Sequence, residues 1–320
     1  MDKLIVTDTH FGCHGNSFTW LDHQLKVFYE QIIPAARKHS YTLIHCGDMF
    51  DNRSSINPYI YYRVDRLLKD LSDVFPEIYI IAGNHDYYSP VEDDYNINSL
   101  YMLHCPDNVH IISQDFHIVD DSLLVPWYCW DRKDEMLSIM QNNHLNKIFC
   151  HTDMDEMGEE DLVRFKGIDI YSGHIHTPWD RGNLHNLGSL YNLTFADNNA
   201  TRGYYILTDH LQYVPNESCI RYWRIYGDEL LTFDTAQLKG PDYIEIYVDQ
   251  DSMDDDRYKD MIHDYKENYN TTLIMDPRQY TSDNIDTTNY DISMICDQNI
   301  PEDLIDYYNI IKQQYQKREI

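Results

Sequence analysis

Five short polar motifs contain the residues of this chain that could do chemistry. Each motif ends a run of apolar, often β-branched residues: LIVTD, TLIHCGD, IYIIAGN, KIFCHT and IDIYSGH. The motifs are DTH at 8–10, GDMFDNR at 47–53, GNHD at 83–86, His151, and GHIH at 173–176. Buried strands deliver side chains to the carboxyl edge of a sheet in this way. Because Asp, Asn and His bind divalent ions, the motifs predict a metal centre at such an edge.

Two divalent ions about 3.5–4 Å apart could be held by this set and could catalyse phosphoester hydrolysis. They would polarise a bridging phosphate and lower the pKa of a bound water towards ~7, so that hydroxide can attack. Such a pair needs one shared carboxylate, because a carboxylate can offer one oxygen to each ion. We expect Asp48 to be this bridge, since the preceding Gly47 lets the backbone turn tightly beside the ions.

The order of these motifs resembles that of the calcineurin-like metallophosphoesterases over about the first two thirds of the chain. Within that superfamily, it is most similar to the SbcD-type DNA-repair nucleases and to the small, nuclease subunits of tailed-phage recombination endonucleases. GDMFDNR and GNHD differ from the protein-phosphatase patterns GDxVDRG and GNHE. Downstream, the stretches HIHTPW, LGSLYNLTFAD and TRGYYILT look like the phage subunit.

The resemblance implies a role for each residue of the motifs. Three residues would bind a first ion, three a second, and one would lie between them: Asp8, His10 and His176; Asn84, His151 and His174; and Asp48. His85 has no ligand role in the family and would face the phosphate or the leaving oxygen as a catalytic residue. Asp51 stands where archaeal and eukaryotic relatives have a His, so any accessory role of that His is absent or changed. Asp51 and Asp86 are expected to orient a ligand histidine or to touch an ion directly.

Other histidines of the chain lack such surroundings. We expect six of them to be structural or surface residues: His14, His23, His39, His45, His104 and His117.

All seven ligand positions are intact, which weighs against a non-catalytic scaffold that has kept the fold and lost the metals. A phosphatase or a cyclic-nucleotide phosphodiesterase of the same superfamily is the alternative enzyme, and a missing accessory domain would favour it.

The charge of the chain argues against unaided DNA binding. It has 54 acidic and 25 basic residues and a formal net charge of −29, whereas a nucleic-acid enzyme normally presents a basic face. We therefore expect a catalytic subunit whose partner supplies most of the contacts to the DNA backbone.

The seven cysteines form no CxxC pair and are expected to be reduced. No stretch reaches 18 apolar residues, so we expect a cytoplasmic protein, in a bacterial host if phage-encoded, and no membrane span.

The elements that must position the motifs alternate between strand and helix. Helices are predicted at 20–39, 58–74 and 131–143, and antiparallel strands over 110–128 with a turn at Asp120-Asp121. The runs LHNLGS, GYYILT and LQYVP predict a second set of strands. This pattern predicts a four-layer α/β/β/α sandwich over residues 1–216. Strands and a helix over 217–298 predict a small α+β unit, in the position of the capping domain that guides DNA in the family.

A terminal helix is predicted over 299–320, with Pro301 in its first turn. Its apolar face includes Leu304, Tyr308 and Ile311, spaced as on one side of a helix. The helix either packs on its own domain or, as the resemblance implies, docks on an SMC-type ATPase subunit similar to SbcC. Together with these features, the resemblance implies a Mn²⁺-dependent DNA phosphodiesterase, a 3′→5′ double-strand exonuclease and single-strand endonuclease, and a homodimer within its complex.

Overall fold

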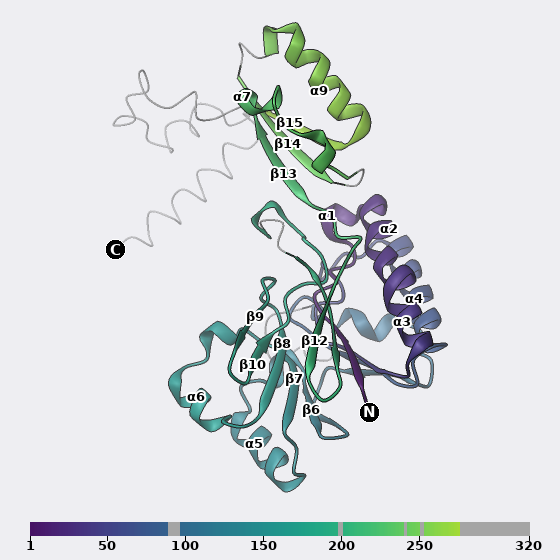
Figure 1. Cartoon of the computed structure of the whole chain (residues 1–320). Helices are drawn as coiled ribbons and strands as arrows, with labels where there is room; N and C mark the ends of the chain where they lie inside the picture. Colours follow the sequence, from purple (N-terminus) through teal and green to yellow (C-terminus); the bar gives the residue numbers. More distant parts are fainter. Residues whose placement is uncertain (89–96, 198–200, 240–241, 250–252, 276–320) are drawn as a thin grey trace, which may run out of the picture.

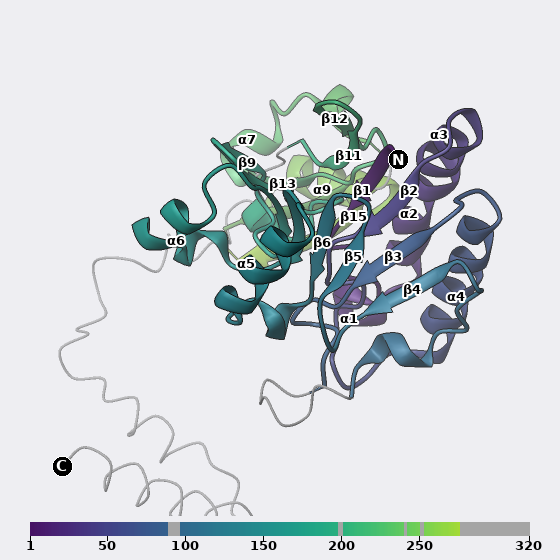
Figure 2. The same cartoon turned by 90° about the horizontal axis from the view of Figure 1, so that it is seen from below.

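A computed structural model describes residues 1–88, 97–197, 201–239, 242–249 and 253–275. Two six-stranded mixed sheets pack face to face, and helices cover their outer faces (Figures 1 and 2). In order across the first sheet, the strands are β12 (Leu211–Pro215), β11 (Gly203–Leu207), β1 (Lys3–Val6), β2 (Thr42–His45), β3 (Ile78–Ile81) and β4 (Val109–Ile112). In order across the second, they are β5 (His117–Val119), β6 (Ser122–Val125), β7 (Lys147–His151), β8 (Asp169–Gly173), β10 (Leu184–Asn186) and β9 (Trp179–Arg181). The predicted four-layer α/β/β/α class is confirmed.

Alternating side chains of β1 explain why both faces of the first sheet are covered. Leu4 and Val6 point into the core under the helices, whereas Ile5 packs against the second sheet. Leu43 and Ile44 of β2 divide in the same way. Successive side chains of a strand face opposite sides, so a continuous apolar run requires a layer on each side.

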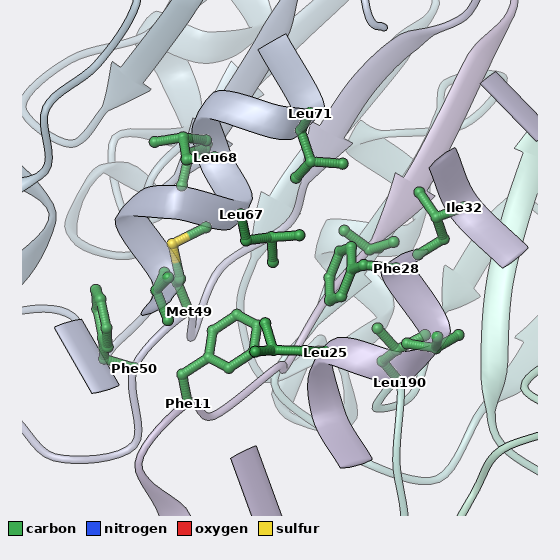
Figure 3. Close-up of a cluster of buried hydrophobic side chains, with 14 of the residues drawn as sticks. Phe11, Leu25, Phe28, Ile32, Met49, Phe50, Leu67, Leu68, Leu71 and Leu190 are labelled. Atoms are coloured by element: carbon green, nitrogen blue, oxygen red, sulfur yellow. The ribbon is translucent and has the colours of Figure 1, made fainter. Parts of the chain in front are cut away.

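Helices α2 (Phe18–Val27), α3 (Ile33–Lys38) and α4 (Pro58–Ser72) cover the first sheet. A π-helical segment, η1 (Phe28–Ile32), joins α2 to α3, so the predicted helix at 20–39 is present with an altered turn in its middle. The Asn57 side chain caps α4 by accepting a hydrogen bond from the Tyr59 backbone N–H at 2.9 Å. Figure 3 shows Phe28, Leu67 and Leu71 from these helices meeting in one apolar cluster. On the second sheet, α5 (Lys133–Asn142) buries Met136 and Met140.

Two strand predictions need correction. Residues 110–128 were expected to be antiparallel strands, but β4 pairs in parallel with β3, and only β5 and β6 form the antiparallel hairpin, turning at Asp120 and Asp121. Val109 contacts the core under the helices and Ile112 the core between the sheets, so β4 extends the first sheet. The three later runs do not form one set. β10 joins the second sheet, while β11 pairs antiparallel with β1 and with β12 in the first.

The C-terminal unit is a three-stranded parallel sheet of β13 (Tyr222–Tyr226), β14 (Tyr243–Val248) and β15 (Asn270–Met275). Helices α7 (Gly227–Leu230) and α9 (Asp256–Asn268) accompany it, and Ile246, Ile262 and Tyr265 lie in its core. The strands and helix expected within 217–298 are present up to residue 275, and 276–298 lie outside the described residues. Residues Leu304, Tyr308 and Ile311 of the predicted terminal helix lie outside the described residues.

The C-terminal unit touches the main domain beside α1, at the end opposite the N-terminus (Figure 1). The ring of His14, in the short helix α1 (Cys13–Asn16), stacks on Tyr243 with ring centroids 5.5 Å apart. Its Nε2 lies 2.9 Å from the hydroxyl of Tyr222, which itself donates to the Leu193 carbonyl. Among the described residues, no helix is both long and apolar enough to cross a membrane.

Candidate metal centre

The carboxyl ends of strands from both sheets meet at one edge, and all seven predicted ligands lie there. Asp8 and His10 follow β1, Asp48 follows β2 and Asn84 follows β3. From the second sheet, His151 ends β7, and His174 and His176 follow β8. Because parallel strands end at a common edge, five loops far apart in sequence converge.

The backbone at this edge adopts left-handed conformations that residues other than glycine rarely take. The φ angles of Asp8, His10, Asp48 and His174 are 50°, 43°, 55° and 87°. Such left-handed residues cost of order 1–3 kcal/mol each and cluster at functional sites. Backbone hydrogen bonds hold two of them in place: Asp8 N–H donates to the Gly47 carbonyl and His10 N–H to the Asp48 carbonyl, both at 3.0 Å.

Gly47 is required by both its conformation and its neighbours, as the sequence predicted. Its φ is 96°, and a Cβ at this position would lie 2.3 Å from His151 Nδ1. Gly173 is equally constrained, because a Cβ there would lie 2.1 Å from Thr7 Oγ1 and 2.6 Å from Asp8 Oδ2. Side chains at either position would push candidate ligands out of place.

The candidate ligands form two groups that share Asp48. Ligand atoms of Asp8, His10 and His176 lie within 4.8 Å of one another, as do those of Asp48, His151 and His174. Asp48 Oδ2 lies 3.6 Å from His10 Nε2 and 3.2 Å from His151 Nε2, between the two groups. Asn84 Oδ1 completes the second group, 3.0 Å from His151 Nε2 and 3.1 Å from His174 Nδ1. This arrangement can hold two cations with a carboxylate between them.

Hydrogen bonds from behind orient these side chains toward the shared space. His151 Nδ1–H donates to the Cys46 carbonyl at 2.8 Å, so that Nε2 faces the group. Thr7 Oγ1–H donates to Asp8 Oδ2 at 2.6 Å, and the His174 N–H also reaches this carboxylate. Such outer partners fix the tautomer and direction of metal ligands.

The chemistry of the donor set fits divalent cations. Both ring nitrogens of His10 are buried without a well-formed hydrogen bond, as expected for a side chain whose partner is an ion. Although burial disfavours an imidazolium, the Asp51 and Asp8 carboxylates raise the pKa of His10 to about 10. Burial likewise opposes the charge on His151, but Asp48 raises its pKa to about 9. The site therefore attracts positive charge, and a metal ion would compete with these protons.

Asp51 and Asp86 lie beside the ligands and contact different groups. Asp51 Oδ1 is 3.2 Å from His10 Nδ1, where it can orient that ring. Asp86 is fully buried and accepts backbone N–H bonds from Met49 at 3.1 Å and Gly83 at 2.9 Å. Asp86 thus ties together the loops that hold Asp48 and Asn84. Its hydrogen bonds are with backbone N–H groups, whereas we expected it to orient a ligand histidine or to touch an ion directly.

His85 is placed differently from the ligand histidines. Its backbone N–H donates to Asp48 Oδ1 at 2.8 Å, and its Nδ1–H donates to the Asp51 carbonyl at 2.6 Å. Nε2 is then the nitrogen available to a substrate. Its ligand atoms also come within 4.8 Å of those of His10 and Asp51, so geometry alone allows a third group of donors.

Sequence reasoning missed a buried arginine behind the GHIH motif. Arg202 is 1% exposed, and its guanidinium donates to the His176 carbonyl, to Asn192 Oδ1 at 2.9 Å and to Asp197 Oδ1 at 3.0 Å. Asp197 in turn accepts from the Leu193 N–H at 2.7 Å. Arg202 belongs to the TRGYYILT stretch, which was noticed but carried no role, because an isolated Arg gives no sign of burial.

Of the six histidines expected to be structural or surface residues, two make well-defined contacts within the fold. His45 Nε2 lies 3.0 Å from Thr9 Oγ1 in the core, and His14 packs against the C-terminal unit. Burial lowers the pKa of His45 to about 4, so this ring is neutral at ordinary pH. His104, by contrast, is exposed at the surface.

Comparisons with known proteins agree with this geometry. Residues 1–291 match the family model of the calcineurin-like phosphoesterases. Exonuclease subunit 1 of Enterobacteria phage T4 is 25% identical over 236 residues, which cover 68% of this chain and 68% of that protein. The nuclease MPE of Pseudomonas putida matches 57% of this chain and 65% of its own with 16% identity and a TM-score of 0.28. A TM-score this low supports no structural argument.

Replacing Arg202 by Lys should lower the affinity of the site for one of the two ions. Lysine keeps a charge beside Asp197. Its one nitrogen cannot take the positions of the three guanidinium nitrogens, so it cannot also hold the His176 carbonyl. Loss of such an outer partner lowers metal affinity by about tenfold or more, and calorimetric titration with Mn²⁺ measures it. Arg221→Lys is the matched control, since Arg221 pairs with buried Asp242 in the C-terminal unit. Equal losses in both variants would contradict the assignment.

Proposed function

Because the chain belongs to the calcineurin-like phosphoesterase family, we propose that it is the two-metal nuclease subunit of a DNA recombination or repair complex. The observation that carries this proposal is the convergence of seven metal-binding side chains on one sheet edge, with Asp48 between two groups. The likeness to a phage exonuclease subunit supports DNA as the substrate. The expected activities are 3′→5′ exonuclease on duplex DNA and endonuclease on single strands.

In this proposal the protein holds the reacting groups in fixed positions. Asp8, His10 and His176 would hold one ion, Asn84, His151 and His174 would hold the other, and Asp48 would contribute to both. When bound, two divalent ions supply Lewis-acid polarisation of the phosphate and a water of lowered pKa. His85 directs Nε2 toward the substrate, where it stabilises charge on the phosphate or protonates the leaving 3′ oxygen.

We propose Mn²⁺ as the natural metal. The donors are carboxylate, amide and imidazole groups without sulfur, which suit Mn²⁺ better than Ca²⁺, and Mg²⁺ exchanges its water reluctantly for imidazole. DNA cleavage rates measured in parallel with Mn²⁺ and Mg²⁺ test this choice, and equal rates would contradict it.

The acidic composition supports a partner that binds DNA. With a net charge of −29, the chain gains little long-range attraction to phosphate. We propose an ATPase subunit of SMC type, similar to SbcC, as this partner. Its docking segment would be the terminal residues around Leu304, Tyr308 and Ile311.

We propose in addition that two copies of the chain pair through an exposed apolar patch. Large side chains that are about half or more exposed surround a hollow of 560 Å³ beside α4: Tyr62, Tyr88, Ile97 and Met102. Apolar side chains gathered in this way mark interaction surfaces. Sedimentation of the isolated chain tests the pairing, and a monomer at micromolar concentration would argue against it.

Two alternative functions are less well supported. A phosphatase or cyclic-nucleotide phosphodiesterase would be favoured by a missing accessory unit, yet a three-stranded sheet with two helices follows the main domain. A scaffold without metals would not need left-handed backbone at Asp8, His10 and Asp48.

Asp48→Asn tests the two-metal nuclease directly. Because Asp48 is expected to bind both ions, the amide should lower metal occupancy and reduce Mn²⁺-dependent DNA cleavage by orders of magnitude. Circular dichroism should show an unchanged fold. Asp70→Asn at the surface is the control. A folded Asp48→Asn protein that cleaves DNA at nearly the wild-type rate would rule out this centre.

His85→Ala should separate metal binding from chemistry. Without the imidazole, the protein should still bind two Mn²⁺ ions in calorimetry, but its turnover of DNA should fall about 10²–10⁴-fold, the range of a lost general acid. His104→Ala, which changes an exposed histidine, should have no effect on turnover. Loss of one bound ion in His85→Ala would show instead that His85 is a ligand.

Deleting residues 300–320 tests the docking segment. If the segment binds the ATPase, the shortened chain should cleave short single strands with Mn²⁺ as before but should no longer co-purify with the ATPase or support ATP-stimulated processing of duplex ends. If the helix packs on its own domain, the deletion should lower the melting temperature of the isolated chain. An unchanged ATPase interaction would end the docking proposal.

A further inference from the structure

A hollow lies immediately beside the candidate metal centre. Its volume is 280 Å³, and three aromatic side chains line it: Trp127, Tyr128 and Trp130. Thr152 and three carboxylates, those of Asp131, Asp153 and Glu156, complete its lining. We call this feature the aromatic hollow. None of these residues belongs to the five metal-binding motifs, and the proposed mechanism gives the hollow no role.

Trp127 connects the aromatic hollow to the metal centre. It begins the 3₁₀ turn η4 (Trp127–Cys129) after β6, so it emerges at the same sheet edge as the candidate ligands. Its backbone N–H donates to the Ala82 carbonyl at 3.0 Å, just before Gly83 and Asn84. The indole lies 4.8 Å from the ring of His174 and 5.9 Å from that of His151, measured between centroids. A group resting on Trp127 would therefore be next to a phosphate held at the second group of ligands.

The three aromatic residues do not serve the same purpose. Trp130 is buried and stacks on Phe165 with centroids 5.8 Å apart, which accounts for it as core. Trp127 and Tyr128 are only partly buried and contribute to the hollow. Trp127 lies beside the candidate ligands His174 and His151, and part of its indole stays exposed.

We propose that the aromatic hollow holds the unpaired base of the nucleotide adjacent to the scissile phosphate, with Trp127 as its stacking surface. The inference rests on the proposed nuclease function and adds a subsite to it. Aromatic side chains bind bases of single strands by stacking, which tolerates any sequence because every base has a π face. Trp127 links the hollow to the second group of ligands, because its indole lies against the rings of His174 and His151.

The charge of the hollow selects the base over the phosphate. Asp131, Asp153 and Glu156 repel the sugar–phosphate backbone, but carboxylates accept hydrogen bonds from the exocyclic amino groups of bases. A base within a duplex is already stacked and paired, so only an unpaired nucleotide can turn into the hollow without an added cost of unstacking. The subsite thus favours cleavage within single strands or at frayed ends.

The test combines Trp127 variants with DNA that lacks single bases. Cleavage positions in a short oligonucleotide are first mapped on gels with wild-type protein and Mn²⁺. An abasic residue is then placed on the 5′ or the 3′ side of a mapped position. We expect one of the two placements to lower kcat/KM of the wild-type protein about tenfold, as a lost stacking partner does. Trp127→Ala should show the same loss on intact DNA and should be indifferent to the abasic residue.

Two controls separate stacking from structure. Trp127→Phe should cleave intact DNA with near wild-type kcat/KM, because it keeps a ring, and Trp179→Ala, which removes a partly buried Trp on β9, should leave cleavage unchanged. Mn²⁺ titration of Trp127→Ala should give wild-type affinity. Weaker metal binding would overturn the proposal, since Trp127 would then act by supporting His174.

The outcomes distinguish the subsite from the function on which it rests. If the wild-type protein does not cleave intact DNA at all, the proposed nuclease function fails. If it cleaves DNA but tolerates abasic residues on both sides of the cut, the nuclease stands and the subsite fails. This second comparison uses only wild-type protein, so it remains decisive even if Trp127→Ala does not fold.

Discussion

Buried carboxylates at one sheet edge are the constraint on which the rest of this structure depends. Asp8, Asp48 and Asp86 are each at most 2% exposed. Isolated charges in such surroundings would cost many kcal/mol, so each must be paired, hydrogen-bonded or bound to a cation. Asp86 obtains backbone N–H groups, whereas Asp8 and Asp48 face imidazoles. The glycines, the left-handed residues and the tautomer of His151 all serve to keep these few groups in position.

The convergence of the candidate ligands at one edge could be predicted because it depends on local sequence and one topological rule, whereas their division between two ions came from the family resemblance. A hard ligand directly after an apolar strand will lie at the carboxyl edge, whichever sheet the strand joins. This is why His151, His174 and His176 lie at the expected edge although the second sheet was not fully foreseen. Sheet membership depends on long-range pairing, and the short run Gly203–Leu207 gives no sign that its partner is β1. The roles of Arg202 and Trp127 were not predicted for the same reason, because they depend on neighbours that are distant in sequence.

The C-terminal unit is connected to the metal edge through a short path. α1 follows the DTH motif after only two residues, and His14 within it stacks on Tyr243 and meets the hydroxyl of Tyr222. Burial lowers the pKa of His14, which favours the neutral ring that such stacking requires. The orientation of the C-terminal sheet is thus tied to the same loop that presents Asp8 and His10.

The pairing of β1 with both β2 and β11 also bears on how the protein is made. β1 spans residues 3–6, yet its second neighbour, β11, spans 203–207. While the ribosome is still adding the intervening residues, one edge of this central strand has no native partner, and open strand edges invite foreign pairing. The arginine that fixes the His176 carbonyl also arrives only at position 202. A product that ends before residue 202 would therefore lack both the second partner of β1 and the guanidinium that contacts the His176 carbonyl, so its candidate metal edge would be held less firmly.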